Sequence, residues 1–210
     1  MKIPLLILGA GGFAEDVCDI AMDTDIYDVI GFACDVGRET LPPSLLGKPV
    51  YWLDDVIVGL PHGTHVIPGM GSAKRSTAIG RCRDAGLPLA NVVHPTARIS
   101  TRAELGNGIV IGPQSTISIG CYLADGVIIN RGVTIGHHTF IHTCATVAPG
   151  VNIAGNVVIM PGATIGMGAN VIEKVTIGAA AMVGSGSVVV RDVEPGITVI
   201  GIPAKPLVKA

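Results

Sequence analysis

The chain has 210 residues, enough for one large domain or two small ones. Charged residues make up 14% of it and aromatic residues 3%, a composition that excludes a coiled coil and a disordered tail. The formal net charge of −2, without any basic cluster, gives no electrostatic basis for binding nucleic acid or a membrane surface. We therefore expect a globular protein with neither of these partners.

The distribution of apolar residues and cysteines indicates where the protein works. No apolar run approaches the roughly 18 residues that a membrane span needs, and the run at 3–8 lacks the features of a cleaved secretory signal. The five cysteines are odd in number and widely spaced, which suits neither a disulfide framework nor a CxxC metal site. We expect reduced thiols and a cytoplasmic location.

The first elements in chain order are a strand, a glycine-rich turn and a helix. An apolar run at 3–8 leads into a Gly-Ala-Gly-Gly turn at 9–12, and a helical pattern follows from 13 to about 22. Glycine lets backbone N–H groups approach an anion, and a helix N-terminus favours negative charge, so this turn suits a phosphate. The turn lacks the third glycine of the dinucleotide fingerprint, and a turn that merely connects strand to helix is the alternative.

A second apolar run at 29–33 ends in Cys34 and Asp35. An acidic residue at this place, about twenty residues after the glycines, suits recognition of a ribose or of a base edge. The second strand therefore adds a possible nucleotide contact to the phosphate-binding turn.

A third strand at 65–67 leads into a Pro-Gly-Met-Gly-Ser turn and a helix from about 73 to 85. Three strand–helix units in so short a segment predict a small Rossmann-like domain with a parallel sheet, at 1–86. A unit of this size suits a mononucleotide better than a dinucleotide.

A six-residue repeat runs from about 92 to 190. From Val93 to Val189 every sixth residue is Ile, Leu or Val, and the residues two places earlier are almost all small or β-branched. Neither a helix nor a simple strand has a period of six, whereas a short strand and a tight corner, repeated on each face of a prism, have it. The pattern predicts a parallel β-helix in a second domain, at 87–210, that includes a C-terminal tail.

Hexapeptide β-helices of this type resemble the left-handed β-helix acyltransferases. The Gly-Ala-Gly-Gly turn, the Asp after the second strand and the G-x-G before a helix narrow the resemblance to the nucleotide-sugar acetyltransferases. That family includes UDP-amino-sugar and GDP-perosamine N-acetyltransferases and the sialic acid O-acetyltransferases. The resemblance implies an α/β plus all-β fold with a left-handed β-helix, a homotrimer with active sites between neighbouring prisms, and acetyl-CoA and a nucleotide sugar as substrates. An inert β-helical scaffold is the alternative.

The resemblance also assigns residues to the nucleotide site, because the N-terminal domain of the family holds the nucleotide of the sugar substrate. The matching positions are Gly11, Gly12 and Phe13 in the first turn, Cys34 and Asp35 after the second strand, and Gly71 after the third. Phe13 and Cys34 differ from the acid or histidine that the family often has nearby. The sugar and its nucleotide (UDP, GDP or dTDP) therefore stay open.

Three histidines, His137, His138 and His142, lie within six residues of one another. No carboxylate or cysteine stands beside them at ligand spacing, so we predict no metal. Imidazole, with a pKa of about 6.5, suits removal of a proton from an acceptor that attacks a thioester.

The family places its catalytic histidine in a segment I-x-H-[DE] after an Asn-containing turn, which implies that His137 is the general base. Where the family has a carboxylate, this chain has His138. His138 can hold the tautomer of His137 through a hydrogen bond but cannot supply a full negative charge. A solvated histidine on the prism surface is the alternative for His137.

In the family, acetyl-CoA lies along the cleft between two prisms. The positions that match its contacts are Thr146, Met167, Gly184, Ser185 and Lys205. Lys205 belongs to a Gly-Ile-Pro-Ala-Lys segment that matches the G-x-P-A-[KR] ending of hexapeptide transferases, where the lysine can approach the CoA phosphates.

Together these features predict an acetyl-CoA-dependent N-acetyltransferase that acts on the amine of a nucleotide-linked amino sugar, with His137 as the base in an inter-subunit cleft. A sugar O-acetyltransferase and a non-catalytic β-helical nucleotide-sugar-binding protein are the alternatives. The absence of a carboxylate beside His137 favours the last of these.

Overall fold

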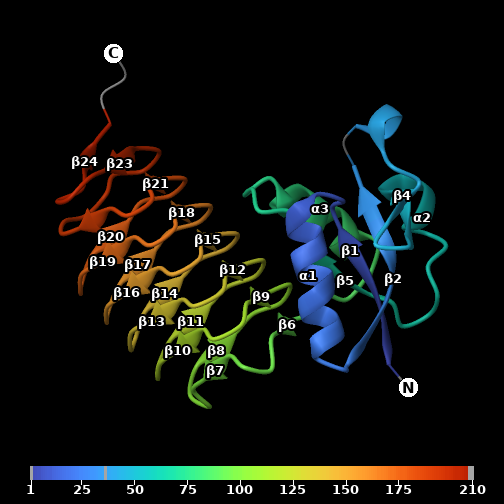
Figure 1. Ribbon diagram of the computed structural model, residues 1–210, viewed down its shortest axis with the longest axis horizontal. Helices are drawn as coiled ribbons and strands as arrows, with labels where there is room; N and C mark the ends of the chain where they lie inside the picture. The colour runs from blue at the N-terminus through green and yellow to red at the C-terminus, as the bar shows by residue number, and fades with distance from the viewer. Residues whose placement is uncertain (1, 36, 208–210) are drawn as a thin grey trace.

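The computed structural model describes residues 2–35 and 37–207, and Figure 1 shows them as two parts, an α/β unit followed by a β-helix. The α/β unit contains every element predicted for it from the sequence. These are β1 (Ile3–Leu8), α1 (Gly12–Asp23), β2 (Tyr27–Cys34), β5 (His65–Pro68) and α3 (Arg75–Asp84).

The sequence pattern does not predict the elements between β2 and β5. They are η1 (Arg38–Thr40), β3 (Ser44–Leu45), β4 (Lys48–Trp52) and α2 (Leu53–Val56). β4 is Lys-Pro-Val-Tyr-Trp, and its apolar part is too short for periodicity to identify it as a strand. Its position depends on pairing with β2, which is a contact distant in sequence.

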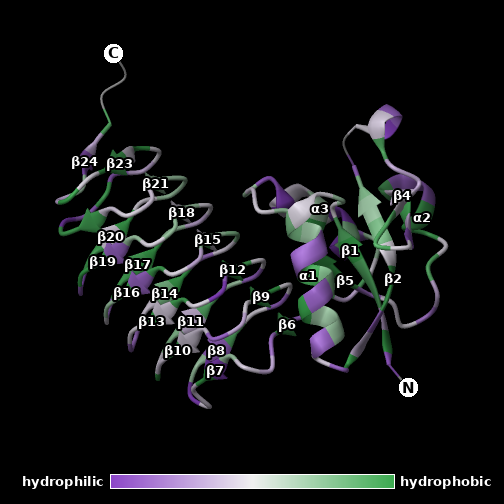
Figure 2. Cartoon of the chain, in the orientation of Figure 1, coloured by the Kyte–Doolittle hydropathy of each residue, from purple (hydrophilic) through white to green (hydrophobic). Residues whose placement is uncertain are grey.

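The sheet of the α/β unit has the order β3-β4-β2-β1-β5 and is parallel except for the β3–β4 hairpin. Successive residues of β1 face opposite sides of this sheet: Leu5 and Ile7 pack with α1, while Leu6 and Leu8 pack with residues of α2 and α3. Figure 2 shows hydrophobic residues on the strands and a mixed surface on α1. Because β2 and β5 flank β1, the strand order reverses at β1, and ligands of such sheets bind beyond the carboxyl ends at this point.

The β-helix is built from strands of two residues, or three in β23, that stack into three sheets, which we call the first, second and third faces. The first face contains β6 (Val92–Val93), β9 (Val110–Ile111), β12 (Ile128–Ile129), β15 (Thr146–Val147), β18 (Thr164–Ile165), β21 (Met182–Val183), β23 (Thr198–Ile200) and β24 (Lys205–Pro206). The second face contains β7 (Arg98–Ile99), β10 (Thr116–Ile117), β13 (Thr134–Ile135), β16 (Asn152–Ile153), β19 (Asn170–Val171) and β22 (Val188–Val189). The third face contains β8 (Glu104–Leu105), β11 (Tyr122–Leu123), β14 (Phe140–Ile141), β17 (Val158–Ile159) and β20 (Thr176–Ile177).

The pairing register of the β-helix confirms the repeat. From β6 to β22, neighbours on a face are parallel and eighteen residues apart, as in the pairing of Thr116 with Thr134, so one coil consists of three six-residue units. At the C-terminal end of the first face, β23 pairs with β21 sixteen residues away, and β24 is antiparallel to β23. The sixth-residue register of aliphatic side chains is buried from Ile111 to Val189, and only Val93, Ile99 and Leu105 at the open end are partly buried. The interior of the β-helix is therefore one continuous apolar core.

The corners of the β-helix share one backbone conformation. From Gly108 to Gly186 every sixth residue has a positive φ, in the left-handed region. Glycine adopts this region without strain, which explains much of the glycine content. His138 is one of the non-glycine residues at such a corner, with φ 55°.

The α/β unit packs on the first face of the β-helix. Val92, Val110 and Ile128 point outward from this face, yet they are at most 1% exposed because they belong to the same hydrophobic cluster as α1. The corresponding outward residues of the third face, Tyr122 and Phe140, are 36% and 44% exposed. Figure 1 shows α1 between the sheet and the β-helix. The part of the chain described by the structure contains no helix long and apolar enough to cross a membrane.

Candidate functional site

A cavity of about 650 Å³ lies at the carboxyl ends of β1, β2 and β5. Most of the residues assigned to the nucleotide site line it, namely Gly11, Phe13, Cys34, Asp35 and Gly71. Gly12 is the first residue of α1 and is not among the lining residues. The cavity therefore brings together the ends of three strands that are far apart in the sequence.

The glycines around this cavity fall into two groups. A Cβ atom on Gly69 would lie 2.5 Å from Cγ2 of Ile7, and one on Gly9 would lie 3.0 Å from the Gly69 carbonyl, so packing requires both glycines. In contrast, a Cβ atom on Gly11, Gly12 or Gly71 would meet no atom within 4 Å. Packing within the chain gives no reason for these three glycines, whereas a ligand close to the backbone would.

The start of α1 has the electrostatics of an anion site. Gly11 is the N-cap residue, and no side chain caps the helix. Its first N–H groups and the helix dipole are therefore directed toward the space beside Gly11. A phosphate group of a nucleotide suits this position.

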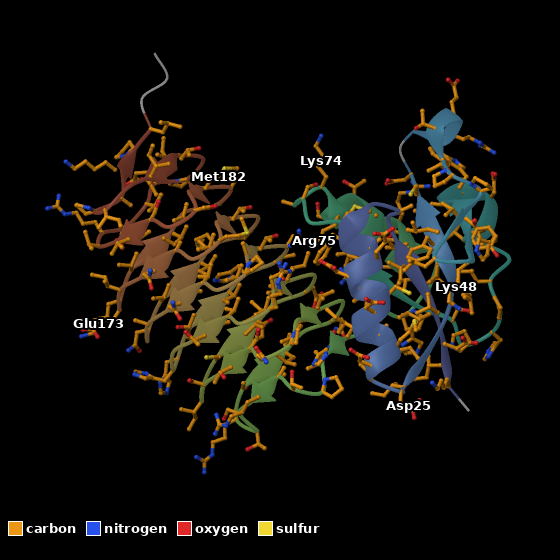
Figure 3. All side chains as sticks on the ribbon, in the orientation of Figure 1. Asp25, Lys48, Lys74, Arg75, Glu173 and Met182 are labelled. Carbon is orange, nitrogen blue, oxygen red and sulfur yellow. The ribbon has the colours of Figure 1, made fainter. Side chains whose placement is uncertain are left out.

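Other residues complete the cavity wall. One wall comes from the segment after η1, for which the sequence carries no motif, and another comes from the start of α3, next to the G-x-G turn. The additional lining residues are Gly9, Ala10, Thr40, Leu41, Pro42, Gly69, Met70, Ser72, Lys74 and Thr77. Lys74 provides a positive charge at the rim, and Figure 3 shows its side chain extending from the start of α3.

Asp35 is held by a neighbouring cation. Nη1 of Arg81 lies 3.7 Å from its Oδ2, and Arg81 also pairs with Asp54. Cys34, just before Asp35, is 8% exposed, and burial raises the pKa of its thiol. Cys34 therefore lines the cavity as a neutral group, while Asp35 is oriented by Arg81.

His137 and His138 lie at the corner between the second and third faces, where both side chains are exposed. Their Nδ1 atoms are 3.1 Å apart and the rings meet edge to face, with centroids 5.3 Å apart. A proton between the two nitrogens makes one ring the donor. When His137 donates, its Nε2 carries a free lone pair and can act as a base.

Glycines of the neighbouring coils make room for these two rings. A Cβ atom on Gly155 would lie 2.6 Å from Cε1 of His137, and one on Gly120 would lie 2.7 Å from Cδ2 of His138. Gly155 follows His137 by one coil, and Gly120 precedes His138 by one coil. The two rings therefore rest against opposite coils.

His142 follows β14, at the corner between the third and first faces, and so does not share the corner of His137 and His138. The described residues contain no group of three or more His, Cys, Asp or Glu side chains arranged to hold a metal ion.

The residues assigned to acetyl-CoA lie on the first face or at its corner with the second. Met167 and Ser185 are one coil apart at this corner, and Gly184 adjoins Ser185. Lys205 lies in β24, at the last edge of the same face. Thr146 begins β15, and its Oγ1 donates a hydrogen bond of 3.2 Å to the carbonyl of Gly71, which lines the cavity of the α/β unit.

Within one chain, His137 lies on the side of the β-helix opposite the α/β unit and its cavity. The α/β unit covers the first face, and the corner between the other two faces is opposite that face of a three-sided prism. Glu173 lies at the same corner as His137, two coils further along, and Figure 3 shows it pointing away from the α/β unit. A single chain therefore does not bring the cavity and His137 together.

Comparisons with known proteins give the family of the chain. No protein-family model and no curated protein matches it. Among solved structures, PerB from Caulobacter crescentus in complex with CoA and GDP-perosamine is 30% identical, with a TM-score of 0.89 over 97% of each chain. A variant of perosamine N-acetyltransferase from the same organism, with a histidine replaced by asparagine, is also 30% identical, with a TM-score of 0.89 over 98% of this chain and 97% of the other.

The acetyltransferase domain of PglB from Neisseria gonorrhoeae, in complex with acetyl coenzyme A, is 30% identical, with a TM-score of 0.92 over 99% of this chain and 100% of the other. The stacked parallel sheets fit the left-handed β-helix of such acetyltransferases. Because the similarity extends over nearly the whole of both chains, the protein belongs to the hexapeptide-repeat nucleotide-sugar acetyltransferases.

Proposed function

We propose that this protein transfers the acetyl group of acetyl-CoA to the amine of a nucleotide-linked amino sugar. The observation that carries the proposal is the combination, in one chain, of a cavity whose open glycines suit a nucleotide and an exposed histidine pair on a β-helix. The relatives solved with CoA and GDP-perosamine support the same pair of substrates.

The α/β unit, at about 1–86, is in this proposal a Rossmann-like domain that binds the nucleotide. Its diphosphate would lie at the N-terminus of α1 beside Gly11 and Gly12, close to Lys74. Asp35, oriented by Arg81, would contact the ribose or the base. Phe13, Cys34 and Gly71 would complete the pocket.

The β-helix, within 87–210, is in this proposal the acyltransferase domain of a homotrimer. The position of His137 opposite the α/β unit supports this, because a neighbouring chain must then supply either the histidine or the nucleotide. The exposed aromatic pair Tyr122 and Phe140 on the third face would become buried between chains. Acetyl-CoA would lie along the first face and its corner, in contact with Thr146, Met167, Gly184, Ser185 and Lys205. We also infer a cytoplasmic location, in agreement with five buried, unpaired cysteines.

The proposed mechanism is direct attack by the amine on the thioester carbonyl. Nε2 of His137 accepts a proton from the attacking nitrogen, while the Nδ1–H of His137 donates to Nδ1 of His138 and so fixes the tautomer. A backbone N–H at a corner of the β-helix stabilises the oxyanion of the tetrahedral intermediate. The intermediate then expels the CoA thiolate, which takes the proton from His137. The products are the N-acetylated sugar and free CoA.

Release of CoA, followed with amino and hydroxy nucleotide sugars, tests the proposal. Release with amino sugars alone is the expected result, and release with hydroxy sugars alone would assign O-acetylation instead. His137→Ala is expected to lower kcat by roughly 10²–10⁴-fold, because a general base contributes about that much. Normal turnover by a folded His137→Ala protein would exclude His137 as the base.

His138 has its own matched test. His138→Leu removes the acceptor for the Nδ1–H of His137, and we expect kcat to fall by roughly tenfold, the effect of one hydrogen bond. His138→Gln keeps a side-chain oxygen that can accept this bond and should retain most of the activity. Equal kcat values for the two variants would contradict a role for His138 in orienting His137.

A further inference from the structure

Arg75, at the start of α3, is a charged side chain with no exposed surface. Among the described residues it forms no salt bridge, and its guanidinium is bound entirely by backbone carbonyls. Nε donates to the carbonyl of Gly126 at 2.8 Å, and Nη1 donates to that of Gly71 at 3.2 Å. Nη2 donates to the carbonyls of Cys144 and Ala145 at 2.7 and 2.9 Å.

These carbonyls belong to two parts of the molecule. Gly71 is in the turn that lines the nucleotide cavity, whereas Gly126 and Cys144 are at corners of two successive coils of the β-helix. Figure 3 shows Arg75 where α3 faces the β-helix. One rigid, planar group therefore connects the nucleotide turn to two coils at once.

The position of the Gly71 carbonyl is fixed from a second side by Thr146, whose Oγ1 donates to the same oxygen. Thr146 belongs to β15 of the first face, so both donors tie the turn to the β-helix. Two donors on one carbonyl fix the position of the turn itself. Packing of α3 against the β-helix would not require them.

A buried guanidinium costs free energy of desolvation unless it is hydrogen-bonded, so its use to connect two parts of a protein is unusual. Burial lowers the pKa of Arg75 to about 10, which still leaves it charged at neutral pH. Only the fork of an arginine reaches carbonyls on several sides, since a lysine ammonium is a single point of charge on a flexible chain. The Arg75 side chain therefore fixes both the orientation of the Gly71 turn and its distance from the β-helix.

We propose that Arg75 is a positioning residue that holds the nucleotide-binding turn at a fixed place on the β-helix and so determines where the sugar amine enters the catalytic cleft. This inference rests on the proposed function. It assigns Arg75 no contact with the substrate, since each of its three guanidinium nitrogens donates to a backbone carbonyl.

The test compares Arg75→Lys with Arg83→Met. Arg83 lies on the same helix and pairs across the same interface with Asp125 at 2.7 Å, but it does not contact the turn. We expect Arg75→Lys to lower kcat/KM for the nucleotide sugar by roughly 10–100-fold, because a small misplacement of a reacting group has effects of this size. The KM for acetyl-CoA should change less than the kcat/KM for the nucleotide sugar, because Arg75 bonds the Gly71 turn directly and meets the β-helix only at backbone carbonyls. Arg83→Met should leave both constants at wild-type values.

Amide hydrogen exchange of the segment 68–77 gives a readout that does not depend on activity. Exchange should be faster in Arg75→Lys than in the wild type and unchanged in Arg83→Met. If Arg75→Lys fails to fold, Thr146→Val removes the other donor to the Gly71 carbonyl without touching a buried charge, and it should also speed exchange.

Two results would overturn the proposal: wild-type exchange of the segment 68–77 in folded Arg75→Lys or Thr146→Val, or equal kinetic losses in Arg75→Lys and Arg83→Met. A wild-type protein that transfers no acetyl group to any nucleotide sugar would instead refute the proposed function. In that case the exchange experiment still decides whether Arg75 holds the turn.

Discussion

The β-helix repeats one packing arrangement in every coil, whereas each element of the α/β unit packs against different neighbours. In the β-helix a residue's place in the eighteen-residue coil decides whether it is inside, outside or at a corner. In the α/β unit, β1 pairs with two other strands, and its side chains face two separate hydrophobic clusters. The difference affects how function can be recognised in each part.

In the β-helix, the residues proposed for catalysis depart from the repeat. His137 and His138 place two imidazole rings at a corner, with His138 in a backbone conformation that is mostly occupied by glycine. In the α/β unit, the residues proposed to bind the nucleotide include glycines that packing does not require, such as Gly11 and Gly71. The following experiments test this distinction, beginning with the largest expected effect.

The repeat predicts that interior positions of the β-helix are equivalent except at its open end. Ile141 is 0% exposed in the middle of the core, whereas Ile99 is only partly buried. Ile141→Ala should lower the free energy of unfolding by about 2–5 kcal/mol through loss of burial and creation of a cavity. Ile99→Ala should lower it by clearly less. Urea denaturation of both variants measures the difference, and equal losses would show that the end of the β-helix is as tightly packed as its middle.

Substitutions at Gly155 and Gly150 distinguish an effect on catalysis from an effect on the stability of the β-helix. Gly155→Ala places a Cβ atom against the ring of His137 and should reduce kcat by roughly 10–100-fold through displacement of the base. Gly150 has φ 69° and open space, so Gly150→Ala should destabilise the fold by about 1 kcal/mol through strain but leave kcat unchanged. Thermal denaturation and steady-state kinetics of the two variants test both statements. A normal kcat for Gly155→Ala would mean that the ring of His137 moves without consequence.

Gly69 and Gly71 provide the corresponding pair in the α/β unit. Gly69→Ala should lower the free energy of unfolding by about 1–3 kcal/mol, because its methyl group would collide with Ile7 and Ala14. Gly71→Ala should leave stability nearly unchanged and raise the KM for the nucleotide sugar by roughly tenfold, the effect of losing about one close contact. A loss of stability without a change in KM for Gly71→Ala would remove this turn from the proposed nucleotide site.

The same difference explains what could be predicted from the sequence. The β-helix could be predicted nearly residue by residue, because its contacts recur at a fixed spacing. The cavity could be predicted only where a glycine turn or a strand end marked it. Its wall at Thr40 to Pro42, and strand β4, depend on packing between distant segments that carry no motif.

Arg75 is the clearest case of a residue that sequence reasoning could not interpret. Its partners are carbonyl groups, which every residue has, so nothing in the sequence at Gly126 or Cys144 indicates them. Thr146 differs in another way: the family pattern assigns it to acetyl-CoA, and the structure adds a contact with Gly71 that the pattern does not contain.

The eighteen-residue coil also determines which insertions and deletions keep each residue on its own face of the β-helix. An insertion of eighteen residues, one full coil, before His137 in the sequence would lengthen the β-helix and leave every later residue on its own face. An insertion of six residues would keep the core intact but rotate all later residues by one face. Met167 and Ser185 would then move together to the corner between the second and third faces. The β-helix can therefore gain or lose length and keep every later residue on its own face only in whole coils.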